Sequence, residues 1–233
     1  MNTIYFPAHE RGFFNHGWLK ANHTFSFGHY FDPMKIGFGT IRVFNDDLIA
    51  PLKGFGTHSH EDMEIVTIPL KGELTHKDSL GSEEVIRSGE VQRMSAGSGI
   101  SHSEYNNHQK IEANALQIWI TPKKLGIKPN YEQKDFSLLK QHNYWQLIVS
   151  PNGRDESLSI NQDAFFSIGT FEKKAVYERH LSSNGVFVFV ISGTVIIGDQ
   201  SINARDGLGI INVDRVECNP SKMSEILIIE IPL

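Results

Sequence analysis

Two short stretches, "GTHSHEDMEI" at 56–65 and "SGISHSEYN" at 98–106, each carry two metal-ligand residue types, two positions apart and close to glycines. Side chains two apart on a β-strand share one face, so each pair can present two donors to the same side of a sheet. If the two strands converge, four donors face one point, and three neutral imidazoles with one carboxylate suit a divalent first-row metal. The residues concerned are His58, His60, His102 and Glu104.

The rest of the chain has the pattern of short strands. Runs rich in Val, Ile, Phe and Thr, such as "TIRVF", "LQIWIT", "VFVFVIS" and "EILIIEIPL", alternate with turn-forming runs such as "NDD", "PNGRDES" and "GDQS". Strands at this density, without a sustained helical period of apolar residues, predict an all-β sandwich or barrel.

An internal repeat divides the chain. Segments 70–99 and 191–219 share one order of strand, glycine, strand, polar turn, strand, and a polar residue with glycine that opens another strand. The stretch "TPKKLGIKPNYEQKDF" (121–136) is polar and broken by Pro and Gly, so it is the candidate boundary. We therefore expect two β-barrel, jelly-roll-like modules, the first over residues 1–130 and the second over residues 131–233.

The repeat also predicts which module holds a metal. Matching the first glycine of the two repeats carries the His-x-His pair onto Arg179 and Leu181, which are not metal ligands of the expected kind. His180 lies between them and, by strand alternation, would point to the opposite face. We expect the metal in the first module and none in the second.

Composition excludes other classes of function. The formal net charge is −5 and the sequence pI is about 6.1, with Lys and Arg scattered, so nothing favours binding to nucleic acid. The start lacks a secretory pattern, and no run reaches the roughly 18 apolar residues of a membrane span. The single cysteine, Cys218, cannot form an internal disulfide and is expected to be a small buried apolar side chain. We expect a cytoplasmic protein.

A family resemblance emerges from the motifs together. "GFGTHSHEDMEIVTIPLKG" (54–72) resembles the first cupin motif and "GEVQRMSAGSGISHSEYN" (89–106) the second, although Gly97 replaces the usual Pro and the second motif is two residues longer. With "HGWLKANHTFSFGHYFDP", "IGFGTIRVFNDD" and "HKDSLG", the chain resembles the pirin family, and within it the bacterial pirin-like quercetin 2,3-dioxygenases. The resemblance covers most of residues 11–122 and implies a bicupin with a metal in the first barrel only.

The resemblance implies an oxidoreductase that cleaves flavonol-type substrates such as quercetin with O2. It implies one divalent ion per chain, Fe(II) first, with Zn, Mn, Ni, Co or Cu as alternatives, and Glu104 as both ligand and general base. The alternative function is a non-enzymatic metal- and redox-sensing pirin that regulates a partner protein. Neither function implies nucleic acid or membrane as a direct partner.

Several residues remain open to two interpretations. Glu64 is the ligand position in many cupins, and it shares a face with His58 and His60 if that strand is regular, as does Asp62. His76 and Asp78 fit a satisfied strand histidine and a turn cap better than a pocket lining. In the aromatic-rich opening segment, His16, His23 and His29 fit packing or hydrogen bonding, with a lid over the cavity as the alternative. Phe25, Phe27 and Phe31 fit the core, with a platform for the substrate as the alternative.

Overall fold

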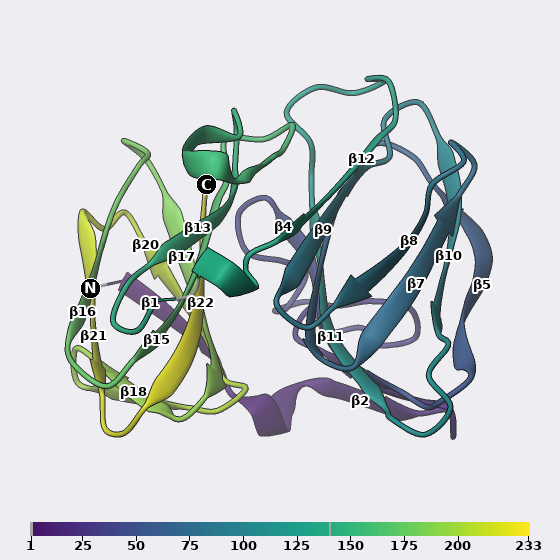
Figure 1. Ribbon diagram of the computed structural model, residues 1–233. Coiled ribbons are helices and arrows are strands. Elements are labelled where there is room, and N and C mark those ends of the chain that lie inside the picture. Colours follow the sequence, from purple (N-terminus) through teal and green to yellow (C-terminus); the bar gives the residue numbers. More distant parts are fainter. Residues whose placement is uncertain (1, 140) are drawn as a thin grey trace.

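The computed structural model describes residues 2–139 and 141–233, which form two β-modules lying side by side (Figure 1). Within this described part of the chain, no helix is long and apolar enough to cross a membrane. Its helical elements are the short 3₁₀ segments η1 (Ala8–Glu10), η2 (Ser137–Leu139) and η3 (Arg154–Glu156).

The first module consists of a seven-stranded and a four-stranded sheet, each antiparallel throughout. In sheet order, the larger sheet contains β12 (Asn130–Asp135), β9 (Glu90–Ser95), β6 (Glu64–Lys71), β11 (Ala113–Ile120), β4 (Ile41–Ile49), β3 (Leu19–His23) and β2 (Gly12–Asn15). The smaller sheet contains β5 (Lys53–His60), β10 (Ile100–Asn106), β7 (Glu73–Asp78) and β8 (Glu83–Arg87).

The second module repeats this plan. In sheet order, its larger sheet contains β1 (Asn2–Phe6), β20 (Gly207–Ile211), β17 (Gly185–Ser192), β22 (Ser224–Ile231), β15 (Phe165–Phe171), β13 (Gln146–Ser150) and β14 (Leu158–Ser159). Its smaller sheet contains β16 (Ala175–Glu178), β21 (Arg215–Pro220), β18 (Thr194–Ile197) and β19 (Gln200–Asn203).

The repeat expected from the sequence is confirmed strand by strand. The orders β9-β6-β11-β4 and β20-β17-β22-β15 correspond, as do β5-β10-β7-β8 and β16-β21-β18-β19. The matched glycines Gly72 and Gly193 follow β6 and β17 and have φ values of +73° and +91°, a conformation that glycine adopts without steric cost. The all-β, jelly-roll-like class is confirmed, although each module is a pair of facing sheets and not a closed barrel.

The edge strands cross the division that the sequence suggests. β1, at the start of the chain, pairs with β20 in the second module, and the chain then passes to β2 in the first. Figure 1 shows this N-terminal segment in purple, running along the bottom of the molecule from one module to the other. β12, which spans the expected boundary at 130/131, pairs with β9 in the first module. The division into 1–130 and 131–233 stays a prediction about folding units, and sheet membership follows different limits.

The two seven-stranded sheets share one apolar core. Phe44 of β4 packs against Phe187 and Phe189 of β17, with ring centroids 5.2 and 4.6 Å apart, and all three side chains are fully buried. β6 is buried on both faces, because Val66 meets this core while Ile65 faces the inside of the first module. A strand buried on both faces shows a continuous apolar run instead of alternation, which explains the sequence "IVTIPL".

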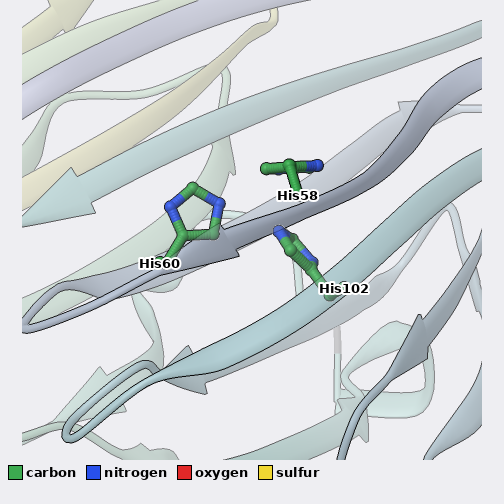
Figure 2. Close-up of side chains that lie close together, drawn as sticks. All are labelled: His58, His60 and His102. Atoms are coloured by element: carbon green, nitrogen blue, oxygen red, sulfur yellow. The ribbon is translucent and has the colours of Figure 1, made fainter.

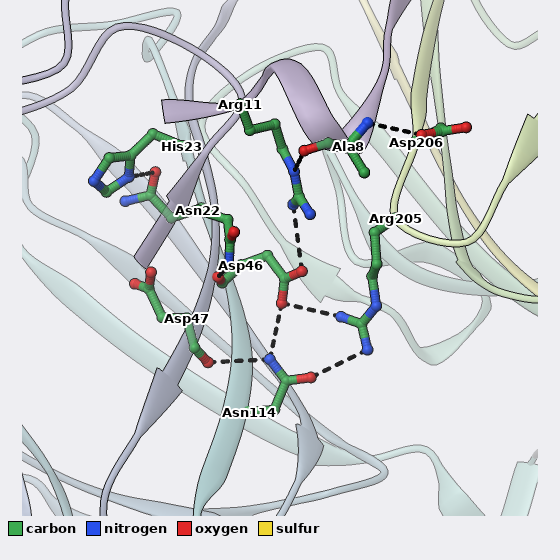
Figure 3. Close-up of polar contacts among 10 residues, drawn as sticks. Ala8, Arg11, Asn22, His23, Asp46, Asp47, Asn114, Arg205 and Asp206 are labelled. Carbon is green, nitrogen blue, oxygen red and sulfur yellow. Dashed lines mark hydrogen bonds and ion pairs between the residues drawn. The ribbon is translucent and has the colours of Figure 1, made fainter. Parts of the chain in front are cut away.

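A polar network also joins the modules. The buried carboxylate of Asp46 accepts hydrogen bonds from Arg11 at 3.3 Å, Arg205 at 3.0 Å and Asn114 at 2.8 Å (Figure 3). Arg205 belongs to the second module and the other three residues to the first. A buried carboxylate that is paired in this way stabilises the contact geometry, because loss of one partner would leave a buried charge uncompensated.

Candidate metal centre

The adjacent strands β5 and β10 bring three histidines together (Figure 2). The register pairs His102 with His58, and His60 lies two residues further along the same face of β5. The ring centroids are 4.8 Å apart for His58 and His60, 4.5 Å for His58 and His102, and 4.9 Å for His60 and His102. One nitrogen from each ring lies within 4.8 Å of the others. Three of the four predicted ligands therefore converge.

A β-bulge shapes the strand pair next to these histidines. Between the pairs His102 with His58 and Glu104 with Phe55, β5 advances by one residue more than β10. A side chain at Gly54 would collide with the carbonyl oxygen of Glu104, so only glycine allows this close approach of the two backbones. Gly54 of the first motif thus serves strand geometry.

Hydrogen bonds fix which nitrogen of His102 is free. Asp78 can only accept, so Nε2 of His76, 3.0 Å from the Asp78 carboxylate, carries a proton. Burial lowers the pKa of His76, so the ring is neutral and its Nδ1 accepts from Nδ1–H of His102, 3.4 Å away. His102 then presents an unprotonated Nε2. This atom is buried and has no hydrogen-bond partner within the residues that the structure describes.

The other two imidazoles are also suited to metal binding. Nδ1–H of His58 donates to the carbonyl oxygen of Gly56 at 2.8 Å, so Nε2 is the ring nitrogen that remains for a metal. Burial lowers the pKa of His60 to about 4 and that of His102 to about 3, with nearby histidines adding to both shifts. Neutral imidazole is the form that binds a divalent ion, so this cluster fits the metal that the sequence predicts.

Glu104 lies next to His102 but outside the three-histidine cluster. One of its oxygens lies within 4.8 Å of nitrogens of His76 and His102. Its carboxylate accepts hydrogen bonds from Gln117 at 2.7 Å and Thr67 at 3.4 Å. Burial raises the pKa of Glu104 to about 7. The assignment of all four residues, His58, His60, His102 and Glu104, as one ligand set stays a prediction.

The alternative carboxylate Glu64 points away from the histidines. Its side chain accepts hydrogen bonds from Ser95 at 2.8 Å and from the backbone of Asn161 at 3.3 Å. The parity that would place it beside the histidines fails because β5 ends at His60 and the chain turns before β6, with Asp62 at φ +46°. Asp62 itself accepts from the backbone of Gly126 and is a loop residue.

A cavity of about 470 Å³ opens beside the cluster and is lined by His58, His60 and Glu104. Aromatic rings form much of its wall: Trp119 makes an edge contact with His60 at 4.8 Å, and Phe27 one with Trp119 at 5.2 Å. This volume lies in the range of small-molecule sites, and its apolar wall with a few polar groups is typical of them.

The opening segment contributes to this cavity. His16, His23 and His29 line it together with Phe27. His23 is also buried and hydrogen-bonded to Asn45, in line with the expected packing or hydrogen bonding, and a lid stays a prediction. Phe25 is fully buried in the core between the modules, as expected, whereas Phe31 is largely exposed.

Sequence reasoning missed several residues of the site. Gln117 and Trp119 come from β11, and Asn45 and Asp47 from β4, on the sheet opposite the histidines. No local motif marks them, because their position depends on which strands face each other. The preferred interpretation of Asp78 as a turn cap holds, since Oδ1 accepts from the backbone of residues 80 and 82. It was incomplete, because Oδ2 orients His76.

The inside of the second module is filled with apolar side chains. Tyr177 of β16 and Val216 and Cys218 of β21 are buried in its core. These strands correspond to β5 and β10 of the first module. Within residues 2–139 and 141–233, the groups of three metal-ligand side chains all belong to the first module.

Comparison with the sequences of known proteins places the chain in a family. One family model, described as Pirin, matches residues 7–120, and another, described as Quercetinase C-terminal cupin domain, matches residues 147–231. A quercetin 2,3-dioxygenase of Escherichia coli (strain K12) is 41% identical over 226 residues, which cover 97% of this chain and 96% of that protein. The chain belongs to the pirin family.

Other relatives of this pirin agree with the assignment. A pirin-like protein of Caulobacter vibrioides is 40% identical over 207 residues, covering 88% of each protein. The crystal structure of the bacterial pirin YhhW from Escherichia coli in complex with nickel(II) has 40% identity and a TM-score of 0.93 over 99% of each chain. The family and its pair of cupin modules are thus confirmed, and a pirin of the same fold binds a divalent metal.

Proposed function

We propose that this pirin is a metal-dependent dioxygenase that cleaves flavonol-type substrates such as quercetin with O2. The observation that carries the proposal is the convergence of three imidazoles, from His58, His60 and His102, beside an aromatic-lined cavity of about 470 Å³. The activity named for the Escherichia coli relative supports the choice of reaction.

We assign the metal to these three histidines with Glu104 as the fourth ligand. Imidazole and carboxylate together suit first-row divalent ions, and four protein donors leave two positions of an octahedral ion open. Fe(II) is our choice, with Ni(II), Zn, Mn, Co and Cu as alternatives to be separated by metal analysis. A bound ion would supply Lewis acidity, which lowers the pKa of a substrate hydroxyl held beside it.

The side chains around the cavity have two further roles in this proposal. Glu104 accepts the proton of the substrate hydroxyl, and the hydrogen bond from Gln117 at 2.7 Å holds its carboxylate in place. Trp119 and Phe27 provide flat apolar surfaces that suit an aromatic substrate and exclude water from the reacting region.

The direct test is turnover of quercetin by the Fe(II)-loaded protein, followed by substrate absorbance, O2 uptake and carbon monoxide release. The proposal predicts equal molar consumption of quercetin and O2, with release of carbon monoxide, in the wild type. His60→Ala should abolish all three signals. His108→Ala is the matched control, because His108 lies in a surface turn where its Nδ1 accepts from the backbone of residues 110 and 111.

The second candidate is a metal- and redox-sensing pirin that regulates a partner protein. The relative from Caulobacter vibrioides is described as a pirin-like protein, a description that names no reaction. A protein that binds its metal, changes the oxidation state of that metal reversibly and leaves quercetin unchanged would favour this candidate over the dioxygenase.

A further inference from the structure

Asp47 is a buried carboxyl group on the wall of the cavity. It lies on β4, and its side chain and that of Asp46 point to opposite sides of this strand (Figure 3). Asp46 forms ion pairs with Arg11 and Arg205 on its side of the strand. Asp47 is 5% exposed, lines the cavity, and its Oδ1 has no hydrogen-bond partner in the described part of the chain.

An unpaired buried carboxyl group is costly, so its presence calls for a physical explanation. Burial raises the pKa of Asp47 to about 8, with the negative charges of Asp46 and Glu104 adding to the shift. The group is therefore mainly a neutral acid at pH 7. A neutral carboxylic acid in an apolar site can both donate and accept a hydrogen bond, which makes it a strong partner for a hydroxyl group.

The surroundings of Asp47 form a polar strip opposite the histidines. Asn45, two residues before it on the same face of β4, is the register partner of Gln117 on β11. The Nδ1–H of His23 donates to the side-chain oxygen of Asn45 at 2.7 Å, which holds both side chains. The polar strip thus continues from Glu104 through Gln117 and Asn45 to Asp47, across an otherwise apolar cavity.

We infer that Asp47 is a specificity-determining residue, whose carboxyl group hydrogen-bonds a phenolic hydroxyl of the substrate away from the hydroxyl that faces the histidines. The inference rests on the proposed function for its substrate class. The Asp47 carboxyl group then favours the binding of polyhydroxylated aromatic compounds over compounds that carry the reacting hydroxyl alone. Histidines on the smaller sheet and Asp47 on the larger sheet then fix the ligand at two points.

Direct binding tests this inference. The metal-loaded wild type, Asp47→Leu and Asp47→Asn are titrated without oxygen with quercetin and with 3-hydroxyflavone, which keeps the reacting hydroxyl and adjacent carbonyl but lacks the other hydroxyls. Tryptophan fluorescence quenching gives each Kd, and metal content and thermal unfolding show that each variant is folded and loaded.

Asp47→Leu should weaken quercetin binding about tenfold, the size of one hydrogen bond to a buried group, and change 3-hydroxyflavone binding less than about twofold. Asp47→Asn should keep quercetin binding within about threefold, because the amide also donates and accepts. Equal effects of Asp47→Leu on both ligands, or no effect, would overturn the inference while leaving the proposed function intact. Failure of the wild type to bind either flavonol would overturn both.

Discussion

His76 and His102 face each other through their Nδ1 atoms, 3.4 Å apart, in a fully buried contact. Since Asp78 accepts from the other nitrogen of His76, the three side chains form one directed chain of hydrogen bonds toward the metal centre. Such a chain holds the ligand in one tautomer and one orientation, which strengthens metal binding.

Loss of the His76 side chain should therefore weaken metal binding, although His76 is not one of the proposed ligands. We expect His76→Ala to lower the metal affinity about 10- to 100-fold, measured by competition with a chelator. Asp78→Asn should have a smaller effect in the same direction, since its amide oxygen still accepts from His76 while the negative charge is lost. His29→Ala, which alters the cavity wall outside this chain, is the control and should stay within about twofold.

Asp47 should make the metal-free protein less stable as the pH rises. Its pKa is about 8 in the folded state and close to 4 in the unfolded state. Between about pH 4 and pH 8 the folded state therefore keeps a proton that the unfolded state has lost, and the free energy of unfolding falls as the pH rises through this range. Asp47→Asn cannot ionise and should escape this loss. We expect its free energy of unfolding to exceed that of the wild type by about 4 kcal/mol at pH 7, from about three pH units at about 1.4 kcal/mol each, and to match it near pH 3.

Urea unfolding at several pH values measures this difference. A gap between Asp47→Asn and wild type that does not change with pH would show that Asp47 is not the titrating group.

The network around Asp46 should contribute strongly to the stability of the two-module contact. Replacing Asp46 by Asn keeps the shape but leaves Arg11 and Arg205 without their negative partner, so we expect a loss of about 2–4 kcal/mol in urea unfolding. Asp163→Asn removes one partner of an exposed ion pair with Lys123 and should cost less than about 0.5 kcal/mol. Equal losses in both variants would contradict the importance of burial.

The hydrogen bond from Gln117 to Glu104 should matter more for turnover than for folding. Gln117→Leu removes the donor at 2.7 Å and leaves Thr67, at 3.4 Å, as the remaining hydrogen-bond donor to the Glu104 carboxylate. We expect kcat for quercetin to fall about tenfold or more and the metal affinity to fall about tenfold, because Glu104 is both the fourth ligand and the proton acceptor in this proposal. An unchanged metal affinity would contradict the role of Gln117 in supporting Glu104 as a ligand.

Local patterns predict the parts of this structure that depend on neighbours in the chain. The strands, the repeat and the spacing of His58, His60 and His102 all follow from two-residue alternation and turn chemistry. The remaining contacts depend on which strands, distant in the sequence, pair with or face each other. Gln117 meets Glu104 because β11 and β10 face each other across the first module, and β1 pairs with β20 at the far edge of the second.

The Glu64 example shows where local parity fails. Two residues on one face of a strand stay together only while the strand continues, and the turn at Asp62 separates Glu64 from the histidines. His76 shows the reverse case, because a strand histidine that seemed merely structural contacts a predicted ligand through a strand pairing that the local sequence does not reveal.

Metal stoichiometry tests the central claim most directly. Purified wild type, His29→Ala and the double variant His58→Ala/His102→Ala are analysed for all first-row metals after equilibration with Fe(II) and removal of free ions. We predict about one ion per chain in the wild type and in His29→Ala, and less than about 0.1 in the double variant. An unloaded wild type, or a double variant that retains its ion, would contradict the assignment of the metal to these histidines.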